Sequence, residues 1–294
     1  MAARRIPKPS STIWLCCIIA IHRLMSVPEY IIDRSTNISY VRNTLKNLDK
    51  RVLMSYCERS GSSEAVAMFL QEMGMYQGLN YTGFVHGFQN KNRKVFSAKY
   101  EQVTLSMLMS NDWYKFKVVR NPYSRMVSSY FQIMFYPQAS TAFFRLFDKL
   151  SLQTNATFEQ FCDLTLSLHT MGRMAGIEQH ASLQAYQFEI DLYHRNGKTY
   201  NQIVHIESFE KDIAVVNRET NMSFHTGLYH DTHNFGHYDP EPGRYYGDIA
   251  FDQLIRMHYF AYPSDYRVFY SDQTLKIIKD VYSNDFMLYE YDNT

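Results

Sequence analysis

The chain has 294 residues, of which 46% are hydrophobic and 16% aromatic, and its formal net charge at pH 7 is +1. A chain of this length and apolar content can bury a large core on its own, which argues against disorder, and four cysteines are too few for a disulfide scaffold. The near-zero charge argues against a nucleic-acid binder that relies on a broad basic field, so an anion would have to be held locally.

The N-terminal residues carry an apolar run whose role the sequence leaves open. Arg4, Arg5 and Lys8 precede the run at 12–21, which is the order found in signal peptides and signal anchors. The run is only about half of the roughly 20 residues that a spanning helix needs, so an ordinary buried helix is the alternative. We treat residues 1–48 as an N-terminal segment with a candidate signal-anchor and stem, and 49–294 as the main domain.

Sequons for N-glycosylation point to the secretory pathway. There are four Asn-x-Ser/Thr sequences, which begin at Asn37, Asn80, Asn155 and Asn221. With the candidate anchor, they favour a membrane protein of the secretory pathway whose main domain lies in the lumen. Of the cysteines, Cys57 and Cys162 could pair or stay as buried thiols, and the sequence does not decide between the two.

Residues 51–74 predict a strand, a turn and a helix. Residues 51–56 (RVLMSY) are typical of a short buried strand, and the small residues of 57–63 (CERSGSS) predict a turn. Good helix formers follow from Glu64 to Met73, and Gly74 is expected to end the helix.

The 57–63 turn has the composition of an anion cradle. Between a strand and a helix, successive backbone N–H groups and the positive helix end point at a phosphate, and Gly61 lets the chain come close. Arg59 adds a bidentate charge, and Ser62 and Ser63 can donate hydrogen bonds. The turn is not a Walker A loop, because GxxxxGK[ST] is absent, and a simple helix N-cap is the alternative interpretation.

A second corner follows a short expected strand at 94–98. Residues 116–119 predict another strand, which delivers Arg120 to a strand end, where ligands bind in open α/β sheets. Pro122 suits the first turn of the next helix, on which Arg125 and Ser128 are three residues apart and share a face. Arg120 and Ser128 could hold one phosphate, or they could be an ordinary salt-bridge arginine and a solvent-facing serine.

The C-terminal half continues the alternation of strands and helices. Residues 202–206 predict a strand that ends at Glu207, with a helix beginning near Ser208, and residues 225–248 resemble a loop. Apolar residues at helical spacing predict one helix over 274–289. The whole pattern predicts an α/β fold with a central, mainly parallel sheet flanked by helices.

The segment VVRNPYSRMVSSY, at 118–130, closely resembles the 3′-phosphate-binding segment of the membrane-associated carbohydrate sulfotransferases, whose pattern is Arg-x-Pro-x-x-Arg-x-x-Ser-x-Tyr. The resemblance implies a P-loop-like sulfotransferase fold over 49–294 and the donor 3′-phosphoadenosine 5′-phosphosulfate (PAPS). It also implies that Arg120 and Ser128 bind the 3′-phosphate of that donor, with Arg125 supporting the loop.

The same family needs a 5′-phosphosulfate loop upstream. SYCERSGSSEAVAMFL, at 55–70, is similar to the Arg-Ser-Gly-Ser-Ser version of that loop and lies about 60 residues before Arg120. The resemblance makes Arg59 the catalytic cation, with donor contacts from the loop residues Ser60, Gly61, Ser62 and Ser63. The segments 204–212 and 280–291 agree with the family more loosely.

A competing loop lies near the N-terminus. RIPKPSSTIW, at 5–14, resembles the Ile-Pro-Lys-x-x-Ser-Thr-x-Trp version, which would make Lys8 the catalytic cation beside Ser11 and Thr12. Almost no chain precedes Lys8 to supply a central strand, and Pro9 removes one cradle N–H. We therefore favour Arg59.

Sulfuryl transfer also needs a base that removes the proton of the acceptor hydroxyl. His86 is our candidate, with Glu64 and His180 as alternatives; a single histidine is often structural, so the role stays open. In EQHASLQ, at 178–184, His180 and Gln184 would share a helical face. The four histidines of the 225–237 loop (His225, His230, His233 and His237) do not have a diagnostic zinc spacing, and the reaction requires no metal.

The resemblance therefore implies a PAPS-dependent carbohydrate O-sulfotransferase of the Golgi lumen that binds a glycan acceptor, and we expect no binding of nucleic acid. Three alternatives remain: an inactive relative or phosphonucleotide-binding module, a nucleotide kinase, and a sugar-nucleotide glycosyltransferase. The kinase lacks the Walker lysine and a Mg²⁺-binding pattern, and the glycosyltransferase lacks an Asp-x-Asp motif. The acceptor sugar, the sulfated position and the oligomeric state are not encoded in any motif.

Overall fold

The structure is a computed structural model that describes residues 43–74, 106–136, 155–172, 179–185, 187–197, 199–227, 236–258 and 261–291. The predictions that concern the N-terminal apolar run, Lys8, the 94–98 strand and His86 lie outside these residues.

Among the described residues, four strands form the central sheet, in the order β1-β2-β3-β4. They are β1 (Thr44–Asn47), β2 (Val52–Tyr56), β3 (Tyr114–Val119) and β4 (Gln202–His205). Strands β2, β3 and β4 are parallel, and β1 is antiparallel to β2. The mostly parallel sheet of an α/β fold is therefore confirmed. Every residue of β2 is buried, as expected for a strand covered on both faces.

The first strand lies within the segment that we set apart as N-terminal. β1 ends at Asn47, and its residues pair with β2 from Thr44↔Ser55 to Asn47↔Val52. The sheet therefore begins before the expected boundary between residues 48 and 49.

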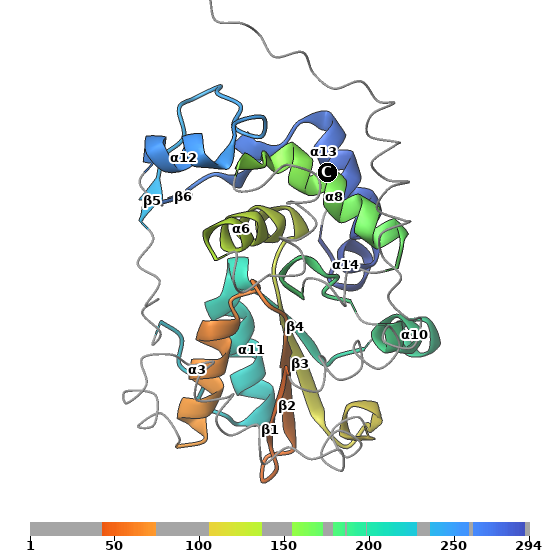
Figure 1. Cartoon of the computed structure of the whole chain (residues 1–294). Coiled ribbons are helices and arrows are strands. Elements are labelled where there is room, and N and C mark those ends of the chain that lie inside the picture. The colour runs from red at the N-terminus through yellow and green to blue at the C-terminus, as the bar shows by residue number, and fades with distance from the viewer. Residues whose placement is uncertain are drawn as a thin grey trace, which may run out of the picture.

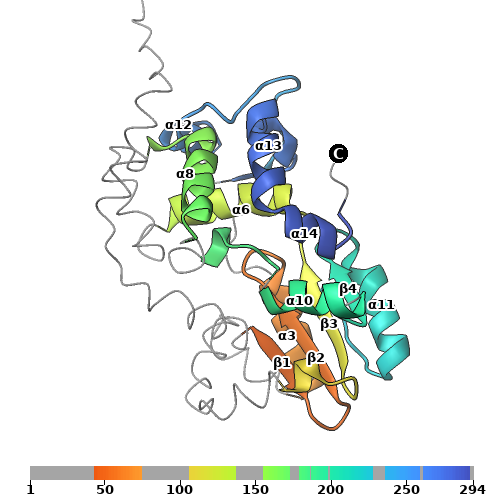
Figure 2. The same ribbon diagram turned by 90° about the vertical axis from the view of Figure 1, so that its right-hand side faces the viewer.

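Helices cover both faces of the sheet. On one face, α3 (Ser62–Glu72) and α11 (Phe209–Thr220) pack against the strands through one apolar cluster. On the other face lies α10 (Gln187–Asn196), as Figures 1 and 2 show. Because β2, β3 and β4 are parallel, their carboxyl ends lie at the same end of the sheet.

A second layer of helices lies beyond that end of the sheet (Figure 1). It contains α6 (Pro122–Phe135), α8 (Phe158–Thr170), α12 (Phe251–His258), α13 (Asp272–Val281) and α14 (Ser283–Leu288). Their shared core is rich in aromatic rings, which include Tyr130, Phe131, Phe158 and Phe251. The candidate loops lie where this helical layer meets the sheet.

Short elements complete the described chain. Two two-residue strands, β5 (His237–Tyr238) and β6 (Tyr262–Pro263), pair in parallel. Three 3-10 turns follow the loops: η6 (Gln179–Ala181), η7 (Ile206–Ser208) and η8 (Tyr266–Phe269). The 225–248 region is loop-like in its described part, apart from β5.

Helix α6 begins as the sequence predicts. Pro122 occupies its first turn, where the missing N–H costs no helical bond. The side chain of Asn121 accepts hydrogen bonds from the backbone N–H groups of Tyr123 and Ser124, at 2.9 and 3.4 Å. This cap turns the chain sharply after β3, so that α6 crosses the strand ends.

Two helical expectations are wrong. The 274–289 segment is not one helix, because the chain breaks at Tyr282 between α13 and α14. The break lets the carboxylate of Asp285 accept the backbone N–H groups of Gln184 and Ala185, at 2.9 and 2.7 Å. Residue 184 lies beyond the short η6 turn, so His180 and Gln184 do not share a helical face.

Candidate active site

The loop between β2 and α3 carries Arg59 and is shaped by two left-handed residues. Arg59 has φ 64° and Gly61 has φ 71°. A Cβ atom at Gly61 would lie 2.3 Å from Cδ1 of Ile206, so this position requires glycine for both conformation and space. Gly61 is the N-cap of α3 and has no side chain that could cap the helix. The first backbone N–H groups of α3 therefore have no side-chain cap from this position, and they lie next to the loop.

The guanidinium of Arg59 reaches across to α6. Its Nε and Nη2 donate to Oγ of Ser128, at 3.0 and 2.6 Å. Its Nη1 donates to Oε1 of Gln132 at 3.0 Å, and Nη2 also contacts the hydroxyl of Tyr262 at 3.4 Å. The two corners that the sequence singled out therefore meet in direct contact.

Arg120 lies at the carboxyl end of β3 beside the same loop. Its Nε donates to Oγ of Ser124 at 3.0 Å, and Nη1 donates to the carbonyl oxygen of Arg59 at 3.4 Å. Burial lowers the pKa of Arg120 to about 10, Arg59 also lowers it, and Glu207 acts in the opposite direction. The guanidinium is still charged at neutral pH, and an anion placed next to it would compensate the two neighbouring cations.

Glu207 and Arg125 support the two corners. One carboxylate oxygen of Glu207 accepts the backbone N–H of Asn121 at 2.8 Å, and the other accepts the hydroxyl of Tyr291 at 3.0 Å. Arg125 is buried and donates to the carbonyl oxygens of Glu58 and Ser182, at 3.0 and 2.7 Å. Arg125 therefore links α6 to the loop before Arg59 and to the segment before Gln184.

The loop serines have different surroundings. Ser60 is fully buried; its hydroxyl donates to Oε1 of Gln184 at 2.6 Å and its N–H to the carbonyl of Cys57 at 3.3 Å. Ser62 and Ser63 are half-buried in the first turn of α3. Ser60 therefore stabilises the loop through its hydrogen bonds, whereas Ser62 and Ser63 lie at the N-terminus of α3.

The alternative bases have protein partners. Glu64 accepts the backbone N–H of Gly227 at 2.5 Å. His180 is half-buried in η6, and its carbonyl oxygen accepts the hydroxyl of Ser129 at 2.5 Å. Neither contact assigns a proton-transfer role, and His86 lies outside the described residues.

A cavity of about 510 Å³ adjoins the loop on its α11 side. Its lining includes three carboxylates and one lysine, namely Glu64, Glu207, Glu210 and Lys211, with Ile206, Ser208, Phe209, Thr226 and Gly227. The excess of negative charge disfavours phosphate groups here, because like charges repel. An anion is better placed on the side of Arg59 and Arg120.

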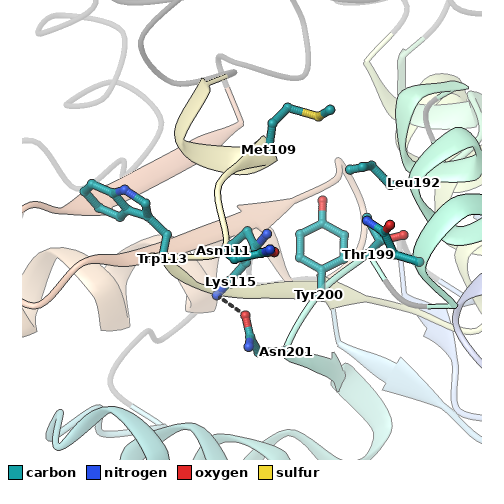
Figure 3. A pocket seen from close by; sticks show the side chains of 9 residues that line it. Met109, Asn111, Trp113, Lys115, Leu192, Thr199, Tyr200 and Asn201 are labelled. Atoms are coloured by element: carbon teal, nitrogen blue, oxygen red, sulfur yellow. Dashed lines mark hydrogen bonds between the residues drawn. The ribbon is translucent and has the colours of Figure 1, made fainter.

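A second cavity, of about 410 Å³, lies at the opposite end of β3 (Figure 3). Its polar lining is mostly neutral, and the only cation there, Lys115, donates from Nζ to the carbonyl oxygens of Leu108 and Ser110. Figure 3 also shows the hydrogen bond between the Lys115 backbone N–H and Asn201. This cavity is separated from the two arginines by the length of the strand.

The described residues hold no group of three or more His, Cys, Asp or Glu that could bind a metal ion. His225 and His237 are among them, whereas His230 and His233 are not. No helix in the described ranges is long and apolar enough to cross a membrane. Cys57 and Cys162 are buried free thiols, and burial raises the pKa of Cys57 to about 12.

Sequence reasoning missed two of the residues that contact Arg59. Gln132 is one helical turn after Ser128, so the i, i+4 rule places it on the same face and could have identified it. Tyr262 comes from a strand more than 200 residues away along the chain, and no local pattern links it to the loop.

The fold and the site define an α/β protein with two neighbouring arginines, Arg59 and Arg120, at the carboxyl ends of parallel strands. A family model described as "Sulfotransferase family" matches residues 1–292. The chain therefore belongs to this sulfotransferase family, which is a carbohydrate sulfotransferase family, and membership supports sulfuryl transfer as its general activity. Searches of curated proteins and of solved structures gave no significant match.

Proposed function

We propose that the protein is a PAPS-dependent O-sulfotransferase that transfers the sulfuryl group to a hydroxyl of a carbohydrate. The observation that carries the proposal is the contact between Arg59 and Ser128, which joins the strand–loop–helix corner after β2 to the corner after β3. A donor with phosphates at both its 5′ and 3′ positions needs two neighbouring anion sites, one for each phosphate.

In this proposal each corner binds one end of the donor. Arg59, Gly61, Ser62 and Ser63 surround the 5′-phosphosulfate, as a P-loop-like cradle does. Arg120 binds the 3′-phosphate with Ser128, whose hydroxyl moves from Arg59 to the ligand. The family generally uses PAPS as its donor, which supports this assignment.

The chemistry is an in-line displacement at sulfur. The acceptor oxygen forms a bond to sulfur, the bond from sulfur to the bridging phosphate oxygen breaks, and 3′-phosphoadenosine 5′-phosphate (PAP) leaves. Negative charge builds up on the sulfonate and the leaving phosphate, and Arg59 with the α3 N-terminus stabilises it. A base, for which His86 stays our candidate, accepts the acceptor proton. The step requires no metal.

Two binding measurements and one transfer assay test the proposal. The protein should bind PAP at least tenfold more tightly than ADP, because only PAP carries the 3′-phosphate. With labelled PAPS and a panel of glycans, the wild type should transfer label, and Arg120→Ala should transfer much less at a low PAPS concentration, because its donor affinity is reduced. Equal affinity for PAP and ADP would contradict the proposal, and tight PAP binding without any transfer would favour an inactive relative.

We also propose that the domain lies in the Golgi lumen. Asn155 and Asn221, which begin two of the sequons, are both exposed in the structure, so both are accessible to glycosylation. Expression in a eukaryotic secretory host should give a band that shifts on treatment with an N-glycosidase, and Asn155→Gln/Asn221→Gln should reduce the shift. Absence of any shift in the wild type would argue against this location.

A further inference from the structure

Gln184 connects the two corners of the proposed donor site. Its side-chain Oε1 accepts the hydroxyl of Ser60 at 2.6 Å and the backbone N–H of Arg120 at 2.9 Å. Its Nε2 donates to the carbonyl oxygen of Arg120 at 2.8 Å. One side-chain amide thus forms hydrogen bonds with the backbone N–H and carbonyl of Arg120 and with Ser60, in the loop that carries Arg59.

The backbone of Gln184 is held just as firmly. Its N–H donates to the carboxylate of Asp285 at 2.9 Å, and its carbonyl oxygen accepts Nζ of Lys117 at 2.5 Å and the hydroxyl of Tyr289 at 3.0 Å. Gln184 is fully buried. A side chain with this many fixed partners has little freedom to move, so it can serve as a spacer.

The supports of Gln184 extend through the molecule. Lys117, on β3, pairs with Glu189 of α10 at 2.7 Å, and Glu189 accepts the hydroxyl of Tyr200. Tyr200 lines the cavity at the far end of β3 (Figure 3). The network therefore ties Gln184 to β3, α10 and α14 together.

We propose that Gln184 is a positioning residue that sets the separation between the 5′ and 3′ anion sites. The inference rests on the proposed function. Gln184 touches no donor atom in this scheme; it acts through Arg120 and the Ser60 loop, which are the groups that touch the donor. A ligand that uses both sites depends on their separation, whereas a ligand that uses one site does not.

The test compares PAP with ADP on the full-length chain by isothermal titration calorimetry. Gln184→Met keeps the length of the side chain and removes all three of its hydrogen bonds. We expect the affinity for PAP to fall at least tenfold, whereas the affinity for ADP, which engages only the 5′ loop, changes less than threefold. A larger loss of affinity for PAP than for ADP indicates a positioning role. A variant that is only unstable would lose both affinities in proportion to its unfolded fraction.

The same substitution at a remote glutamine is the matched control. Gln160 belongs to the capping box of α8, where its side chain accepts the backbone N–H of Thr157 at 2.9 Å. Gln160→Met should lower thermal stability and leave both affinities unchanged. A parallel loss of PAP and ADP binding in Gln184→Met, or no loss of either, would overturn the proposal.

A second variant keeps the test decisive if Gln184→Met does not fold. In Gln184→Glu, a protonated carboxyl group can donate to the Arg120 carbonyl as the amide does, but an ionised one cannot, and burial favours the protonated form. Relative to the wild type at each pH, PAP affinity of this variant should be lower at pH 8 and should recover toward pH 5.5. Equal PAP affinity of the variant and the wild type at pH 8 would overturn the proposal.

Failure of this inference is distinguishable from failure of the proposed function. If the wild type does not discriminate PAP from ADP, the donor assignment is wrong. If the wild type discriminates and Gln184→Met does so equally well, only the role of Gln184 is wrong.

Discussion

At the scale of single residues, the proposed reaction gives Arg59 and Arg120 different roles, which kinetics can separate. Arg59→Ala removes a cation that faces the developing charge, so we expect kcat for sulfuryl transfer to fall by about 10²–10³-fold. Donor affinity should change less, because Arg120 still holds the 3′-phosphate. Steady-state kinetics with PAPS measures both quantities. Arg256→Ala, at an exposed arginine of α12, is the control and should change neither.

A fall in donor affinity without a fall in kcat would assign Arg59 to binding alone. The competing loop at Lys8 offers a further check, since Lys8→Ala should keep kcat if Arg59 is the catalytic cation. If Lys8→Ala lost activity and Arg59→Ala did not, the roles of the two loops would be exchanged.

The lowered pKa of Arg120 predicts how PAP binding depends on pH. Burial lowers this pKa to about 10 in the free protein, and a bound phosphate favours the charged form. Binding therefore takes up a proton above the free pKa, so PAP affinity should fall as the pH rises from about 9 to 11 and stay nearly constant between pH 8 and 9. Calorimetric titrations at several pH values measure this dependence.

The variant Arg120→Ala serves as the control for that profile. It should bind PAP about tenfold to a hundredfold more weakly at pH 8, the range expected for losing hydrogen bonds to a charged group. Its affinity should also vary less between pH 9 and 11 than that of the wild type. Identical pH profiles would show that another group titrates in this range.

At the scale of elements, the junction of β2 and α3 depends on Gly61. In Gly61→Ala the new Cβ atom would lie 2.3 Å from Cδ1 of Ile206. The alanine would also have to adopt the left-handed backbone conformation that Gly61 has. We expect a loss of about 2–4 kcal/mol in the free energy of unfolding, of which the conformation contributes about 1–2 and the overlap the rest. Urea unfolding followed by circular dichroism measures the loss.

Gly172 separates the two contributions. It also has a positive φ, of 65°, but a Cβ there would meet nothing within 4 Å. Gly172→Ala should therefore cost only the conformational part. If both substitutions had the same cost, the contact with Ile206 would not constrain the loop.

The elements that the sequence predicts well are those whose signal is local. Strands β2 and β3 are continuous buried runs, and α6 begins with Asn121 and Pro122, which cap and start a helix on their own. The break between α13 and α14 has no such signal. It depends on the contacts of Asp285 with the backbone of residues 184 and 185, about 100 positions away.

The residues of the candidate site also fall into two groups, those that a local sequence pattern indicates and those that only tertiary contacts reveal. Arg59, Arg120 and Ser128 each lie at a strand end or on the helix that follows it, and parallel topology brings such corners together, but the sequence favours them over a salt bridge and a helix cap only through the family resemblance. Gln184 was noted only as half of a helical pair that does not exist. Its importance comes from contacts with Ser60 and Arg120, and the sequence pattern around it does not encode them.

At the scale of the whole molecule, the buried pair of Lys117 and Glu189 joins the sheet to the helices on its other face. Both side chains have no exposed surface, and Nζ of Lys117 lies 2.7 and 2.9 Å from the two carboxylate oxygens. Glu189 also accepts the hydroxyl of Tyr289 at 2.9 Å, which ties in the C-terminal residues after α14. Each charge is stabilised by the other, because neither side chain is in contact with water.

Removing one charge of this pair should therefore cost more than removing both. Glu189→Gln leaves the ammonium of Lys117 buried without a carboxylate, and we expect a loss of about 3–5 kcal/mol in the free energy of unfolding. Lys117→Met/Glu189→Gln leaves no buried charge, so it should recover at least half of that loss, while the amide oxygen still accepts the hydroxyl of Tyr289. Urea unfolding at pH 7 of four proteins measures the difference: the wild type, the single variants Glu189→Gln and Lys117→Met, and the double variant. If the double variant were as unstable as the sum of the two single variants, charge pairing would not be what holds β3 to α10, and the packing around Lys117 would have to account for the loss.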